Sequence, residues 1–451
     1  MDKFSNKTGR IRPAPEDYLT NETISEINDK GLNETRRAFL VKSFMAASAT
    51  AFGNAVRSEE MPLDGGTDSA LLPLHSTTLG KPVADPAYGQ PSRFEAATVR
   101  RESPGLTRTR QSSASFTPLQ SLFGIITPNG LHFERHHQGW HDIDPSAHRL
   151  MINGLVNTPK MYTLGDLMRL PHVSRMHFLE CGANTAMEWG HPAVPSVQYT
   201  HGMLSCSEFT GVRLSDLLND CGFDQTRAKF ILAEGADGSS LTRTIAIEHA
   251  LDDVIVAWGM NGEMLRPQNG YPLRLVVPGV QGVSWIKWLR RIEVGDAPYG
   301  SKDESMQYID LMPDGLHRQY TSIQECKSVI TAPSGGQILL EKGRFNITGL
   351  AWSGRGKISR VDVSVDGGRN WRTARMEGPI LNKCLTRFNI DWVWDGRAAI
   401  LQSRAIDETG YVQPKINQLR EVRGSKSTYH NNAIQSWLVA ASGEIANVQT
   451  F

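Results

Sequence analysis

Cys181 has the clearest chemical potential in this sequence. It follows the apolar stretch 176–179 and Glu180, and it precedes the small residues Gly182 and Ala183. Small residues at the end of a strand leave room for a bulky group close to the backbone. A thiolate is a ligand that soft metal ions prefer. The position also suits a buried, inert cysteine, so the local pattern alone leaves both interpretations open.

A basic loop is the second candidate for chemistry. Apolar residues alternate with Arg274 over 273–277, so Arg274 should project from the opposite face of a rigid strand. Ser284 and Lys287 follow in a glycine-containing stretch before the next strand. Backbone N–H groups and Lys287 could together bind an anion there. The alternative is a basic strand end that faces water.

Four histidines lie within ten residues, at His132, His136, His137 and His141. A spacing of four residues suits zinc ligands on one face of a helix. Proline and glycine in the same stretch disfavour such a helix. Three interpretations remain open: a zinc site, hydrogen-bonded surface histidines, or an anionic cofactor bound by Arg135 and a neighbouring histidine.

Short apolar runs separated by turns predict the elements that position these residues. Strands are expected at 122–126, 149–156, 172–180, 230–238 (running into an acidic turn) and 251–258. A helix is expected over 162–171 with Thr163 as its N-cap, and a turn and helix over 210–218. Residues 261–263 resemble a hairpin turn. The pattern predicts a mixed α+β domain.

The C-terminal third has a different pattern. Alternating strands are expected at 345–352, 361–365, 384–394 and 399–406, separated by turns. Regular short strands of this kind are typical of a β-sandwich. A chain of 451 residues is also too long for one ordinary core, so two or three domains are expected.

Charge and cysteine usage exclude several classes of protein. The formal net charge of +1 does not indicate nucleic acid or an anionic membrane surface as a partner. No C-x-x-C occurs, which excludes the usual zinc-ribbon and haem c attachment patterns. Cys206 and Cys221 are expected in the core. Cys326 and Cys384 could form a disulfide, although buried thiols are the preferred interpretation.

The N-terminal region resembles a twin-arginine export signal. Arg36 and Arg37 precede Phe39-Leu40, and a mildly apolar stretch continues to about Val56. A short amphipathic helix with two surface arginines is the alternative. We predict a signal region at 1–56, a linker or extended arm at 57–119 and a periplasmic location. This route exports folded proteins, which suits an enzyme that receives its cofactor in the cytoplasm.

Four motifs resemble the sulfite oxidase family of molybdopterin enzymes, and the resemblance runs from about residue 120 to the C-terminus. The motifs are ECGAN (180–184), EGAD (234–237), GYPLRLVVPG (270–279) and IKWL (286–289). Within that family, the runs 132–137, 142–145 and 429–435 resemble the molybdenum subunits of sulfane dehydrogenases. The resemblance implies a molybdopterin-binding domain at 120–300 and an immunoglobulin-like dimerisation domain at 325–445.

The resemblance also implies site residues. Molybdenum would be held by Cys181 and by two dithiolene sulfurs of the pterin. The cofactor-binding positions would be Arg135, His137, Asp237, Asn269, Arg274, Ser284 and Lys287. Many relatives carry histidine at the position of Asn269. Tyr199, Tyr308 and Arg423 fall near substrate-pocket positions of the family.

The activity implied is oxidation of sulfur. The chain has no haem motif of its own, so a separate c-type cytochrome would accept the electrons, and a homodimer would form the core of a hetero-oligomer. Sulfite oxidases carry arginines soon after the cysteine turn, whereas this chain has Thr185-Ala186-Met187-Glu188. A pocket with less positive charge favours a protein-bound sulfane in thiosulfate oxidation. Free-sulfite dehydrogenase and a non-catalytic exported binding protein are the alternatives.

Overall fold

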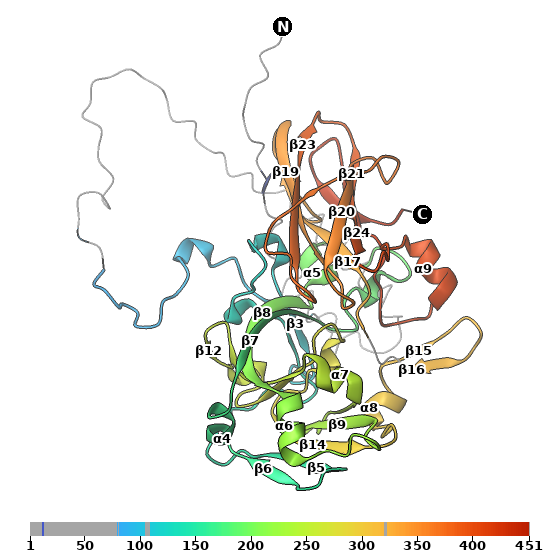
Figure 1. The fold of residues 1–451 in the computed structure, drawn as a ribbon. Helices are drawn as coiled ribbons and strands as arrows, with labels where there is room; N and C mark the ends of the chain where they lie inside the picture. Colours follow the sequence, from blue (N-terminus) through green and yellow to red (C-terminus); the bar gives the residue numbers. More distant parts are fainter. Residues whose placement is uncertain (1–10, 13–78, 80, 104–108, 320–322, 451) are drawn as a thin grey trace.

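The computed structural model describes residues 11–12, 79, 81–103, 109–319 and 323–450 (Figure 1). The predicted twin-arginine signal at 35–42 lies outside the described residues. In the remainder, a mixed central domain leads into a β-rich C-terminal domain, which confirms the predicted fold class. None of the described helices has the length and hydropathy needed to cross a membrane.

Two five-stranded sheets form most of the central domain. The first has the order β10 (Thr242–Ala246), β9 (Phe230–Gly235), β14 (Leu289–Gly295), β5 (Leu150–Gly154) and β6 (Lys160–Tyr162). The second joins β12 (Glu263–Met264), β11 (Ile255–Met260), β8 (Leu204–Arg213) and β7 (Val173–Glu180), with β13 (Arg274–Val276) paired to β11. Both sheets contribute to one apolar core, which includes Ile152, Leu217 and Val256.

Short helices connect these strands. They are α4 (Leu164–Met168), α5 (Val197–His201), α6 (Leu214–Cys221), α7 (Ile247–Asp252) and α8 (Lys302–Ser305). The start of α4 is fixed as predicted, because Thr163 Oγ1 accepts a hydrogen bond from the Asp166 N–H at 3.0 Å. The Asp166 carboxylate accepts one in return from the Thr163 N–H at 2.9 Å.

Two antiparallel sheets form the C-terminal domain, consistent with the predicted immunoglobulin-like sandwich. One is β17 (Lys327–Ala332), β19 (Gly343–Trp352), β23 (Thr386–Trp394) and β22 (Arg375–Met376). The other is β21 (Arg372–Thr373), β20 (Ile358–Ser364), β24 (Ala399–Asp407), β25 (Ser436–Val439) and β26 (Ile445–Val448). The helix α9 (Ile416–Arg423) lies beside the sandwich (Figure 1).

Three small sheets complete the fold. They are β2–β3–β4 (Arg101–Glu102, Ala114–Phe116, Glu134–Arg135), the hairpin β15–β16 (Ile309–Leu311, His317–Gln319) and the pair β1–β18 (Ile11–Arg12, Ile338–Leu339). The strand β3 lies near the end of the predicted linker or extended arm at 57–119, whose residues 57–78 are outside the described residues. Its Phe116 is buried, and the neighbouring Thr117 is hydrogen-bonded to Ser205 at 2.8 Å between their hydroxyl oxygens.

Three other predicted elements differ from the structure. The strand predicted at 122–126 is irregular, because Gly124 takes a positive φ of 61° and Phe123 is exposed. Residues 210–213 extend β8 instead of forming a turn, since all four pair with β11, and residues 210–211 also pair with β7. The strand predicted at 251–258 is divided between the end of α7 and the start of β11.

The two domains meet at β7 and β8. Successive residues of a strand face opposite sides, and here Leu179 packs in the central core while Phe178 packs in the core of the C-terminal domain. Cys181, directly after β7, therefore lies at the boundary between the domains. All five cysteines are described, and each is a free thiol. Cys384 does not pair with Cys326, and its Sγ lies 3.5 Å from that of Cys206.

Candidate active site

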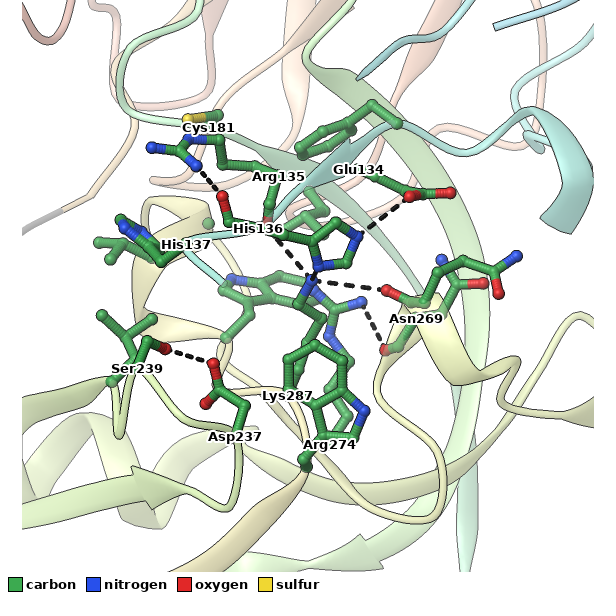
Figure 2. A pocket seen from close by; sticks show the side chains of 18 of the residues that line it. Glu134, Arg135, His136, His137, Cys181, Asp237, Ser239, Asn269, Arg274 and Lys287 are labelled. Carbon is green, nitrogen blue, oxygen red and sulfur yellow. Dashed lines mark hydrogen bonds and ion pairs between the residues drawn. The ribbon is translucent and has the colours of Figure 1, made fainter. Parts of the chain in front are cut away.

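A cavity opens at the end of β7 and brings together residues that are far apart in the sequence (Figure 2). Its lining consists of Phe133, Glu134, Arg135, His136, His137, Leu179, Cys181, Asp237, Ser239, Leu241, Gln268, Asn269, Arg274, Gly282, Val283, Trp285, Lys287, Trp288 and Tyr308.

Cys181 is the first residue of a tight turn that follows β7. Its N–H donates to the Met203 carbonyl at 3.0 Å, and its own carbonyl accepts from the Asn184 N–H at 2.9 Å. The side chain is 8% exposed. Burial raises the pKa of the Cys181 thiol, while the charge of Arg135 opposes that rise. Figure 2 shows the Arg135 side chain beside Cys181.

Gly182 leaves no space for a side chain. A Cβ at this position would lie 2.5 Å from Gln281 Oε1. A side chain at this position would therefore force the Gln281 side chain or the turn to shift, and glycine allows the two to approach closely.

Two adjacent cations lie buried at the opposite side of the cavity. A backbone bridge pairs Arg274 with Lys287. Among the described residues, no carboxylate forms an ion pair with either of them. Burial lowers the pKa of Arg274 to about 9. Burial and the charge of Arg274 hold the pKa of Lys287 well below its usual range. Two uncompensated buried cations are unfavourable unless an anion binds between them.

The polar atoms around these cations are incompletely paired. Arg274 donates from Nη1 to the Asn269 carbonyl at 3.1 Å. Its Nε and the Asn269 Oδ1 are buried, and neither has a hydrogen-bond partner among the described residues. Lys287 Nζ donates to the Arg135 carbonyl at 3.2 Å and lies 2.7 Å from His136 Nδ1. Spare buried donors and an acceptor beside positive charge fit the phosphate and the polar rings of a molybdopterin.

Two of the clustered histidines belong to this cavity as neutral side chains. Burial, followed by the charge of Lys287, lowers the pKa of His136 to about 2. Burial and Arg135 lower the pKa of His137 to about 4. His132 Nδ1 contacts the Phe133 carbonyl instead. The described residues hold no cluster of three histidine, cysteine or acidic ligands, so the histidines do not converge as a zinc site requires.

Tyr308 closes the cavity on the side of the C-terminal domain. Its hydroxyl is hydrogen-bonded to His137 Nε2 at 3.1 Å. Its ring stacks on Tyr429 with 5.2 Å between centroids, and the Arg243 guanidinium lies 5.5 Å from its centroid. Burial raises the pKa of Tyr308. The phenol therefore keeps its proton and can donate a hydrogen bond into the cavity.

The structure brings most of the predicted site residues together. Those that line the cavity are Arg135, His137, Cys181, Asp237, Asn269, Arg274, Lys287 and Tyr308. Ser284 is buried next to the lining residues Val283 and Trp285, without lining the cavity itself.

Two predicted residues lie elsewhere. Tyr199 belongs to α5 and packs edge-on against Phe116, with 5.5 Å between ring centroids. Arg423 ends α9 and lies 3.7 Å from the Asp310 carboxylate. Neither lines the cavity, so their predicted place near the substrate pocket stays a prediction. Both positions lack a flanking motif that would fix their alignment.

Glu188 also lies away from the cavity. Thr185 takes a left-handed backbone with φ of 65° and turns the chain, so Glu188 ends a 3-10 helix (Ala186–Glu188) on the far side of the cysteine turn. Its carboxylate accepts hydrogen bonds from the Ala193 N–H at 3.2 Å and from Asn447 Nδ2 at 2.9 Å. The expectation that Glu188 reduces the positive charge of the substrate pocket is wrong.

Sequence reasoning missed several lining residues. They are Glu134, Ser239, Gln268 and Trp288, whereas His136 was noted only within the histidine cluster. The IKWL motif carried a usable signal for Trp288, because it is adjacent to Lys287 and its ring centroid lies 4.8 Å from Lys287 Nζ. No local pattern distinguished Glu134, which binds His136 Nε2 at 3.0 Å.

Comparison with known proteins agrees with this geometry. Residues 137–302 match the family described as oxidoreductase molybdopterin binding domain, and residues 319–437 match the Mo-co oxidoreductase dimerisation domain. Mitochondrial sulfite oxidase of Mus musculus is 30% identical over 76% of this chain and 66% of its own length. Sulfite oxidase of Gallus gallus is 30% identical over 76% of this chain and 79% of its own length. The chain spans only 56% of the human enzyme.

A solved structure is also similar. A chain from the sulfane dehydrogenase SoxCD of Paracoccus pantotrophus is 47% identical, with a TM-score of 0.83 over 86% of this chain and 100% of that one. With a cysteine turn facing buried cations and with both domains matched, this chain belongs to the sulfite oxidase family of molybdopterin oxidoreductases.

Proposed function

We propose that the protein is a molybdenum-dependent dehydrogenase that oxidises sulfur. The observation that carries this proposal is that one cavity holds the Cys181 thiol and two buried basic side chains, Arg274 and Lys287, neither of which forms an ion pair with a described carboxylate. A thiol suits molybdenum, and the cations suit the phosphate of a pterin. A metal-free binding protein would have no use for either arrangement.

Different residues of the cavity would bind the metal, the pterin and the substrate. A molybdenum–pterin centre bound here supplies two-electron oxidation of sulfur. Cys181 would bind the metal, and Arg274, Lys287, Asn269 and Asp237 would hold the pterin and its phosphate. At the Cys181 end, Arg135 supplies positive charge toward an anionic sulfur group.

Tyr308 and His137 would position the substrate. The Tyr308 phenol keeps its proton and can donate a hydrogen bond to a substrate oxygen. A neutral His137 with its proton on Nε2 would donate to the Tyr308 oxygen across the 3.1 Å between them, which orients the hydroxyl and leaves its proton for the substrate. A fixed donor at the point where negative charge develops lowers the barrier of an oxidation.

We further propose a protein-bound sulfane as the substrate. Identity of 47% to a sulfane dehydrogenase chain supports it. The lack of arginines directly after Asn184 supports it as well. In thiosulfate oxidation the electrons would pass to a c-type cytochrome, and the C-terminal domain would join two copies of the chain in a hetero-oligomer. Export by the twin-arginine route would place the protein in the periplasm.

Free sulfite is the second candidate substrate. The positively charged lining of the cavity favours it, because Glu188 lies outside and does not reduce that charge. Sulfite oxidases are also among the relatives.

One experiment separates these alternatives. The purified protein is analysed for molybdenum and pterin, and it is then assayed with a c-type cytochrome on free sulfite and on a protein-bound sulfane. Molybdenum, together with faster turnover of the bound sulfane, supports the proposal. Turnover of sulfite alone would replace the substrate, and a purified protein without molybdenum would refute the enzyme. Cys181→Ser should fold and lose turnover, so full activity in that variant would refute the role of the cysteine.

A further inference from the structure

Residues 180–185, here called the cysteine turn, are hydrogen-bonded to the C-terminal domain. We infer that Lys327, on β17, is a positioning residue that fixes the turn carrying Cys181. The inference rests on the proposed role of Cys181 as the metal ligand. Lys327 does not line the cavity, so any effect on the site must pass through the residues that it contacts.

The first contact is with Glu180, the residue directly before Cys181. Lys327 Nζ donates to Glu180 Oε1 at 2.9 Å, and both side chains are less than 5% exposed. Asn184 Nδ2 donates to the same oxygen at 3.0 Å. Trp352 Nε1, also from the C-terminal domain, donates to Oε2 at 2.8 Å. The Glu180 carboxylate is thus fixed by three donors.

The second contact joins the other end of the turn. Lys327 Nζ also donates to Thr185 Oγ1 at 3.0 Å, so one ammonium group links residues 180 and 185 on both sides of Cys181. Further hydrogen bonds from the C-terminal domain support the same turn. The His430 N–H donates to the Gly182 carbonyl at 3.0 Å, and Thr185 Oγ1 donates to the Asn431 carbonyl at 2.7 Å.

A purely stabilising role does not explain a buried charge pair. Apolar residues of similar volume usually stabilise a core as well as a buried ion pair does, or better. What a fully hydrogen-bonded pair adds is one defined geometry. Here that geometry includes Glu180, directly before the proposed metal ligand, and Thr185, at the other end of the turn. We therefore expect loss of Lys327 to change the cysteine–metal bond more than it changes the fold.

Lys383 offers a matched control. It forms another ion pair between the domains, with its Nζ 3.1 Å from the Asp252 carboxylate and 2.8 Å from that of Asp253. Within the described part of the chain, no side-chain hydrogen bond or ion pair joins these three residues to the cysteine turn at 180–185, and none of the three lines the cavity. Lys327→Met and Lys383→Met remove the same charge from the same interface, but only the first should reach Cys181.

The test uses the purified holoprotein. Molybdenum X-ray absorption counts sulfur ligands, electron paramagnetic resonance records the Mo(V) signal, and steady-state assays separate kcat from KM. For Lys327→Met we expect a lengthened or lost cysteine–sulfur contribution, a shifted Mo(V) signal and a kcat at least 10-fold lower with KM nearly unchanged. Lys383→Met should match the wild type in all three. A wild-type spectrum and kcat in a folded Lys327→Met protein would overturn the inference.

A second variant covers a failure to fold. Lys327→Met alone leaves the Glu180 charge buried, whereas Lys327→Met with Glu180→Gln removes both charges and keeps an acceptor for Trp352. The double variant should fold and still show the altered spectrum, because Thr185 has lost its donor. A wild-type spectrum in the double variant would overturn the positioning role. A wild-type protein that holds molybdenum without a cysteine ligand would instead overturn the proposed function.

Discussion

Glu188→Gln should make the stability of the protein less dependent on pH. The Glu188 carboxyl is 4% exposed, and none of the described residues forms an ion pair with it. It faces a cavity of about 20 Å³, which it shares with His201. Burial holds the pKa of His201 well below its usual value, so this histidine stays neutral and does not compensate the carboxylate.

The expected magnitude follows from the pKa of Glu188. Burial raises this pKa from 4.5 to about 7, although the hydrogen bond from Asn447 opposes the rise. Between these two values the unfolded chain releases the proton while the folded protein keeps it. The folded state therefore loses stability as pH rises from 4.5 to 7, by about 3 kcal/mol in total, and the loss stays constant above that range. Glutamine does not ionise and removes this loss.

Urea unfolding at pH 5, 6, 7 and 8 provides the assay. Glutamine changes the hydrogen bonding to Asn447 and Ala193, but that offset is the same at every pH. The difference between variant and wild type should move in favour of the variant by about 2.5 kcal/mol from pH 5 to pH 8, because part of the total loss has already occurred at pH 5. Glu421→Gln, at an exposed position on α9, serves as the control and should show no such change. A pH-independent difference for Glu188→Gln would refute the buried, uncompensated carboxyl.

Three further predictions concern the cavity. Arg274→Met or Lys287→Met should reduce the pterin content of the purified protein by roughly 10- to 100-fold, since each removes a charged hydrogen-bond donor, and an unchanged content would contradict the phosphate assignment. Tyr308→Phe should lower kcat by roughly 100-fold with the molybdenum content unchanged, since it deletes one donor; wild-type kcat would exclude that role. Gly182→Ala should fold and lower kcat, because the added Cβ would lie 2.5 Å from Gln281 Oε1 and force the buried Gln281 side chain or the turn to shift; a fully active variant would show that Gln281 alone accommodates the change.

Features with a local cause could be predicted from the sequence. The N-cap of α4 follows from Thr163 and Asp166, three residues apart. The hairpin turn before β12 follows from Asn261-Gly262, which both take the positive φ that such a turn needs. The strand β7 and the cysteine that follows it were predicted from apolar content and small residues. In each case the determining interactions lie within a few positions of the chain.

Features that depend on long-range contacts could not be predicted in this way. The direction of Glu188 depends on the left-handed backbone of Thr185, an uncommon conformation for a β-branched residue. That conformation is accompanied by hydrogen bonds between Thr185 and Asn431, which is 246 positions away. Similarly, the place of Arg423 depends on how α9 packs beside the sandwich. For the same reason the sequence alone does not indicate a role for Lys327, because its partners Glu180 and Thr185 lie 147 and 142 positions away.

Because Glu188 lies outside the cavity, the preference between sulfite and a protein-bound sulfane depends on where the cations of the cavity lie. Arg274 and Lys287 lie together where they suit the phosphate of the cofactor, and Arg135 is the cation whose charge acts on the Cys181 thiol. Positive charge near the reacting sulfur thus comes chiefly from one arginine. A dianionic substrate gains most from several cations, whereas a sulfur chain on a carrier protein gains its affinity from contacts outside the cavity. On the proposed function, this charge distribution therefore favours the protein-bound sulfane over free sulfite. The reason is that few cations lie beside Cys181 among the described residues, and the Glu188 carboxylate has no part in it.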